Sequence, residues 1–126
     1  MSFAQVLGKI IFINLIVVGV VMFIVIGTDT YLAELKKWPK TCQEAAEKIP
    51  RSLAENPYVG KPLGYPFLRE KKISGRRVYY LIYDDLGLVL LVATSDKKDQ
   101  QATIDHIREN LDEFKEVAKS ISKQAF

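Results

Sequence analysis

The sequence predicts an α+β fold in which a helical hairpin and a C-terminal helix pack on a small, mainly antiparallel sheet. Residues 68–83 form two extended runs that flank Ser74-Gly75, and Tyr, Val and Ile crowd the second run, as in half-buried strands. Residues 29–55 and 103–121 carry apolar side chains at helical spacing. This order of elements favours a sheet with helices on one face and a free second face.

The composition is typical of one globular domain. We expect it to bind no metal or other cofactor. The chain has 126 residues, of which 26% are charged and 48% hydrophobic, and its net charge is +3. Cys42 is the only cysteine and His106 the only histidine, so an internal disulfide and a zinc cluster are excluded. A single cysteine fits a reducing compartment such as the cytoplasm.

Residues 10–27 are almost wholly apolar and have two interpretations. A run of this length can cross a bilayer, as a membrane helix over residues 6–26. The lysines that follow it, Lys36, Lys37 and Lys40, would then hold the globular part on the cytoplasmic face of the membrane. An apolar N-terminal helix would thus precede the sheet.

The second interpretation places a buried strand at Phe23–Ile26, ended by Gly27. The soluble domain would then span residues 22–126, and residues 1–21 would be either an anchor or an upstream extension. Nothing in residues 1–21 has the alternation or the stripe needed to complete a small core. We therefore expect a chain that starts at Met22 to fold as a stable soluble domain.

Two prolines divide the helical region. Asp29 or Thr30 can cap a first helix, which Pro39 ends. Residues 41–44, Thr-Cys-Gln-Glu, match a capping box and open a second helix, in which Pro50 predicts a kink or a break.

The C-terminal third predicts a central strand and a final helix. Residues 88–93 are apolar on both faces, as in a strand at the centre of a sheet. Thr103 can cap a helix of about five turns with one apolar stripe. The stripe consists of Ile104, Ile107, Leu111, Phe114, Ala118 and Ile121. His106 falls off the stripe and is assigned no special chemistry.

The hairpin at residues 68–83 carries the candidate functional residues. A two-residue turn at Ser74-Gly75 pairs Lys72 with Arg77 and Glu70 with Tyr79, and directly opposite residues share one face. The predicted core face holds Ile73, Val78, Tyr80 and Ile82. Two cations facing each other weaken a hairpin, so the pair on the free face indicates an anionic partner.

The basic residues around this hairpin extend the pattern. Six bases and one acid lie between Lys61 and Arg77, and the bases are Lys61, Arg69, Lys71, Lys72, Arg76 and Arg77. Such a local stripe on a chain of low net charge is typical of a phosphate-binding surface. The alternative interpretation is a solvated, lysine-rich edge strand that prevents aggregation.

From Phe23 onward the chain resembles the RelE/ParE superfamily of type II toxin–antitoxin toxins. Residues 35–57, LKKWPKTCQEAAEKIPRSLAENP, resemble the helical hairpin of that family. Residues 68–80, LREKKISGRRVYY, resemble its basic strand, glycine turn and following strand. The DDLG turn at 84–87 and the KKDQ segment at 97–100 are most similar to the RelE/HigB branch.

The resemblance implies a metal-independent endoribonuclease that cuts messenger RNA on the ribosome, inhibits translation and is bound by a cognate antitoxin. The ribose 2′-hydroxyl attacks the adjacent phosphate, which requires a base, cations and an acid. Lys72 and Arg77 match the basic pair of the family, and Glu70 is the candidate base. The predicted RNA-binding residues are Arg69, Lys71, Arg76, Lys97 and Lys98.

Three departures from the family pattern leave the nuclease activity open. Glu70 stands where some active members have a lysine, and Arg76 stands where Tyr is frequent. The aromatic residue or histidine expected after the last strand is missing from residues 94–100. Glu70 is either the base or the mark of a lost activity. The alternative is a ParE-like toxin, a class that binds DNA gyrase without cutting RNA, or a binding module of the same fold.

Overall fold

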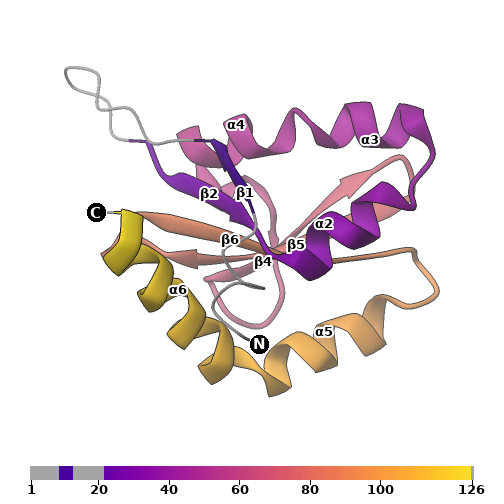
Figure 1. The fold of residues 1–126 in the computed structure, drawn as a ribbon. Helices are drawn as coiled ribbons and strands as arrows, with labels where there is room; N and C mark the ends of the chain where they lie inside the picture. Colours follow the sequence, from indigo (N-terminus) through magenta and orange to yellow (C-terminus); the bar gives the residue numbers. More distant parts are fainter. Residues whose placement is uncertain (1–8, 13–21, 126) are drawn as a thin grey trace.

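The computed structural model describes residues 9–12 and 22–125 of the chain. In this part of the chain six strands form one mixed sheet in the order β1-β2-β6-β5-β4-β3 (Figure 1). The strands are β1 (Lys9–Phe12), β2 (Ile24–Gly27), β3 (Lys61–Pro62), β4 (Leu68–Ile73), β5 (Arg76–Tyr83) and β6 (Leu88–Ser95). The helices are α2 (Asp29–Lys36), α3 (Lys40–Ala46), α4 (Ile49–Glu55), α5 (Gln100–Glu109) and α6 (Leu111–Ala125), with short 3₁₀ turns η1 (Pro57–Val59) and η2 (Asp84–Leu86). The predicted α+β class is confirmed.

Helices cover both faces of the sheet, not one. In Figure 1, α2, α3 and α4 lie on one side of the sheet, and α5 and α6 lie on the other. One core includes Val89 and Leu91 of β6, and the other includes Leu88 and Leu90 of the same strand. A strand that is apolar on both faces leaves apolar surface in water unless both faces are covered. The expectation of a free face was therefore wrong.

Local sequence signals predicted the helix ends approximately, and the structure corrects two of the predicted caps. Thr28, not Asp29 or Thr30, caps α2, because its hydroxyl oxygen accepts from the Tyr31 backbone N–H at 3.2 Å. The expected capping box at 41–44 does not form, since α3 has no side-chain cap. Gln43 instead donates to the Lys36 and Trp38 carbonyl oxygens and fixes the turn between α2 and α3. Pro50 lies at the start of α4 and separates it from α3, as predicted.

The predicted C-terminal helix is two helices that share one apolar stripe. It begins at Gln100, before the expected cap at Thr103, and α5 ends at Glu109. Asn110 interrupts the helix, and its side-chain amide donates to the His106 carbonyl oxygen at 2.8 Å. An asparagine side chain that bonds nearby backbone competes with helix continuation. Ile107 of α5 and Phe114 of α6 still face the same core.

The N-terminal strand interpretation is confirmed where the structure describes it. The buried strand β2 runs parallel to β6, and β1 pairs with it antiparallel. Residues 9–12 are thus a strand and not part of the helix predicted over residues 6–26, of which residues 6–8 and 13–21 lie outside the described ranges. No helix within those ranges has the length and apolar character needed to cross a bilayer. The domain boundary at Met22 stays a prediction.

Candidate functional site

The hairpin has the predicted register. Ser74 and Gly75 have φ angles of +48° and +80°, and positive φ at both positions is the signature of a type I′ turn. Lys72 lies directly opposite Arg77, and Glu70 lies opposite Tyr79. The two candidate cations therefore share one face of the sheet with the candidate base.

That face is not exposed, because the first turn of α5 lies over it. Arg77 is only 6% exposed and Glu70 only 2%. The side-chain amide of Gln100, the first residue of α5, donates to Glu70 Oε2 at 3.0 Å and to Oε1 at 3.4 Å. The expectation of an open pair of cations was correct for Lys72, which is exposed, and wrong for Arg77.

Glu70 and Arg77 form a buried but loose ion pair. Arg77 Nε lies 3.9 Å from Glu70 Oε2, which is beyond hydrogen-bond distance. Arg77 Nε is also buried without a hydrogen-bond acceptor in the described part of the chain. A buried donor without an acceptor is costly, so an acceptor oxygen from a bound molecule would be favoured at this atom.

Tyr79 completes the buried polar group. Its hydroxyl lies 2.7 Å from Ser95 Oγ, and Ser95 is the β6 partner of Arg77. Burial raises the pKa of Tyr79, the hydrogen bond with Ser95 lowers it, and the charge of Glu70 raises it again. Because the net shift is upward, Tyr79 keeps its proton at neutral pH.

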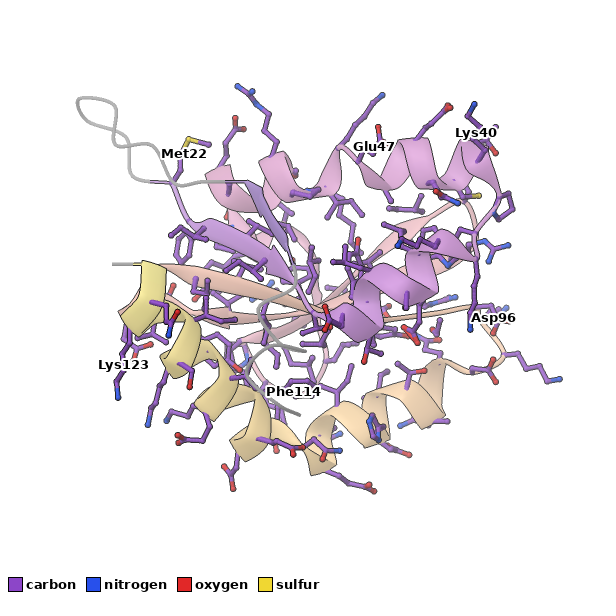
Figure 2. The ribbon with its side chains drawn as sticks, viewed as in Figure 1. Met22, Lys40, Glu47, Asp96, Phe114 and Lys123 are labelled. Atoms are coloured by element: carbon purple, nitrogen blue, oxygen red, sulfur yellow. The ribbon has the colours of Figure 1, made fainter. Side chains whose placement is uncertain are left out.

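Lys97 and Lys98 lie on the rim of this group. They belong to the exposed segment 96–99 between β6 and α5. Ser95 before the segment pairs with Arg77, and Gln100 after it contacts Glu70, so both ends of the segment are fixed at the site. Figure 2 shows the start of this segment, Asp96, at the edge of the molecule.

The remaining predicted cations lie on the opposite face of the hairpin, because side chains alternate along a strand. Arg69 donates to the carbonyl oxygens of Pro66, Tyr58 and Gly60 at 2.8 to 3.0 Å and stacks over the Tyr58 ring. Arg76 stacks over the Trp38 ring at 5.5 Å. Arg69 therefore anchors a loop, and the residues proposed from sequence divide into two groups. The α5 side holds Glu70, Lys72, Arg77, Lys97 and Lys98, and the other side holds Arg69, Lys71 and Arg76.

Sequence reasoning missed Gln100 and a cavity beside the first turn of α5. The cavity measures about 400 Å³ and is lined in part by Glu34, Thr94 and His106. The Glu34 carboxylate accepts from the Thr94 backbone N–H at 2.8 Å. No local signal links two residues so far apart in the chain. No cluster of three possible metal ligands occurs among the described residues.

Compared by sequence, the chain matches no protein-family model and no curated protein. Compared by structure, it is similar to RelE toxins and RelBE complexes. A double arginine-to-alanine mutant of E. coli RelE in the free state has a TM-score of 0.61 and 20% identity, covering 70% of this chain and 97% of that one. A chain of the intact E. coli RelBE toxin–antitoxin complex has a TM-score of 0.53 and 24% identity, and the match covers 60% of this chain and 95% of that one. A chain of the RelBE2 toxin–antitoxin complex from Mycobacterium tuberculosis has a TM-score of 0.54 and 24% identity, and the match covers 60% of this chain and 99% of that one. The fold is therefore that of RelE toxins.

Proposed function

We propose that this chain is the toxin of a type II toxin–antitoxin system and cuts messenger RNA without a metal ion, thereby inhibiting translation. The observation that carries the proposal is the pair of cations, Lys72 and Arg77, on a RelE fold. Within the described part of the chain, Arg77 Nε has no hydrogen-bond acceptor. Similar folds occur in complexes with an antitoxin, so a cognate antitoxin is the proposed protein partner. The proposed substrate is messenger RNA on the ribosome.

The proposed reaction is an internal attack of a ribose 2′-hydroxyl on the adjacent phosphate. Glu70 accepts the hydroxyl proton, and Lys72 and Arg77 stabilise the charge that develops on the phosphate oxygens. As the bond from the 2′-oxygen to phosphorus forms, the bond from phosphorus to the 5′-oxygen of the next nucleotide breaks, and the leaving oxygen takes a proton from water. The products are a 2′,3′-cyclic phosphate and a 5′-hydroxyl. Gln100 and the first turn of α5 must move aside for the phosphate to reach Arg77, because Gln100 binds the carboxylate over that side chain. Lys97 and Lys98 move with this turn or flank it, where they contact neighbouring phosphates.

The burial of Glu70 with Arg77 favours a second candidate. Because these side chains neutralise each other inside the protein, the second candidate is a ParE-like toxin that does not cut RNA, or a binding module with the same fold. In that case the ion pair is structural, and the predicted cations that remain exposed on this side are Lys72, Lys97 and Lys98.

The test is expression of the full chain without an antitoxin. We expect growth arrest with loss of intact messenger RNA, relieved by Lys72→Ala and by Arg77→Ala, because removing one oxyanion donor lowers turnover by about 10²–10³. Lys72 is exposed, so its variant tests the chemistry without disturbing the fold. Lys119→Ala, an exposed lysine on α6, is the matched control and should stay toxic.

The other outcomes separate the candidates. Arrest with intact messenger RNA and inhibited gyrase would support the ParE-like function. Absence of arrest, with the protein present and folded, would support a binding module.

A further inference from the structure

A groove lies between β4 and the helices α3 and α4, on the side of the hairpin away from Arg77. Its volume is about 230 Å³. It is lined by Ala45, Lys48, Ile49, Ser52, Lys71, Lys72 and Ile73. We call this the lysine groove. Three of its seven lining residues are lysines, one carries a hydroxyl group, and none carries a carboxylate.

The cations of the lysine groove lack an acidic partner in the part of the chain that the structure describes. None of Lys48, Lys71 and Lys72 forms a salt bridge with a residue that the structure describes. Lys48 is the N-cap residue of α4 and the other two come from β4, so the fold itself brings the charges together. Like charges held near each other raise the free energy of the folded state, and an anionic group bound among them lowers it.

The lysine groove is also lined by residues of a strand edge. Within the described part of the chain, β3 pairs with Arg69 and Glu70 alone, so the outer edge of β4 has no strand partner there from Lys71 onward. Lys71 and Lys72 are consecutive, and consecutive side chains of a strand project to opposite faces. Lys71 therefore projects to the face of the lysine groove and Lys72 to the face of Arg77, and Lys72, at the strand edge, also lines the groove.

We propose that the lysine groove binds a phosphate of the same RNA strand whose scissile phosphate lies at Arg77. The strand would cross the β4 edge, so that neighbouring phosphates meet Lys72 with Arg77 on one face and Lys71 with Lys48 on the other. Lysine contacts phosphate as a point charge and reads no base edge, so this contact adds affinity without sequence preference. The inference rests on the proposed function, because it assigns a second contact to the same substrate.

The experiment measures binding and not cleavage, so that it is independent of the nuclease activity. The probe is fluorescent single-stranded RNA of ten nucleotides with 2′-O-methyl groups, which cannot cleave itself, titrated into the full chain at several salt concentrations. For Lys48→Ala and Lys71→Ala we expect a several-fold weaker affinity and a salt dependence that is less steep by about 0.7 per lysine. The loss should be the same for different base sequences.

Two variants act as controls. Lys71→Arg keeps the charge and should retain the salt dependence, whereas Lys119→Ala on α6 removes a charge elsewhere and should change neither quantity. Unchanged affinity and salt dependence in the Lys48→Ala/Lys71→Ala double variant, with a native circular dichroism spectrum, would overturn the proposal. Displacement of the RNA by polyglutamate at equal charge would also overturn it, by indicating an acidic protein partner. Growth arrest by the wild type tests the proposed function separately, so the two failures are distinguishable.

Discussion

The two faces of one hairpin use their cations differently. On the α5 face, Arg77 is buried beside Glu70 beneath Gln100. On the α3–α4 face, Lys71 lines an open groove that contains no carboxylate. The residue types alone do not explain this difference, since both strands are rich in bases. What covers a charge decides whether it stabilises the fold or remains available to a partner.

We expect the largest loss of stability when Arg77 is removed from the hairpin face that α5 covers. Arg77→Ala leaves the Glu70 carboxylate buried without its cation, and we expect the free energy of unfolding to fall by about 3 kcal/mol. Lys71→Ala on the open side should change it by less than about 0.5 kcal/mol. Urea unfolding followed by circular dichroism measures both values.

A paired variant controls for lost packing. Arg77→Met with Glu70→Gln removes both charges and should recover most of the stability that Arg77→Ala loses. Equal effects of Arg77→Ala and Lys71→Ala would show that the cover provided by α5 does not isolate the ion pair from water.

A smaller effect on stability is expected at high pH, from the buried Tyr79 on the α5 face of the hairpin. Burial raises the pKa of Tyr79 above its ordinary value of 10.0, so above that pH the unfolded chain loses the proton first and the folded state is destabilised. Tyr79→Phe should cost about 1 kcal/mol at neutral pH, through loss of the hydrogen bond with Ser95. The same variant should lose less stability than the wild type as the pH rises above 10.0. Thermal melting at a series of pH values measures this, and parallel alkaline losses in both proteins would contradict it.

The smallest effect concerns the turn that sets both faces. Ser74 has a φ of +48°, a conformation that asparagine adopts more readily than serine. Ser74→Asn should therefore raise the free energy of unfolding by a few tenths of a kcal/mol. The Ser74→Asn variant should keep the hairpin register and the RNA affinity of the wild type. The Ser74→Val variant, whose new side chain is β-branched, should be less stable than the wild type. A stabilised Ser74→Val would show that the turn is not of type I′.

Several features follow from the sequence because their causes are local. Ser74-Gly75 predicted the turn, and strand alternation then predicted that Lys72 and Arg77 share a face. Pro39 and Pro50 predicted the helix breaks because a proline acts on its own backbone and its neighbour. The strand at Phe23–Ile26 was predictable from a short apolar run ended by Gly27.

The tertiary structure decided what depends on residues distant in the chain. Gln100 contacts Glu70 across thirty positions, so no local pattern could predict that α5 buries the candidate base. The apolar run at residues 10–27 fits a membrane helix or strands equally well by hydropathy, and it is pairing with β6 and β1 that makes Ile24–Gly27 a strand. Sequence alone determined which cations lie together on the hairpin, because alternation is a property of the backbone. Only the packing of α5, α3 and α4 decided which of those cations water and a ligand can reach, because burial depends on the surfaces that the whole chain brings together.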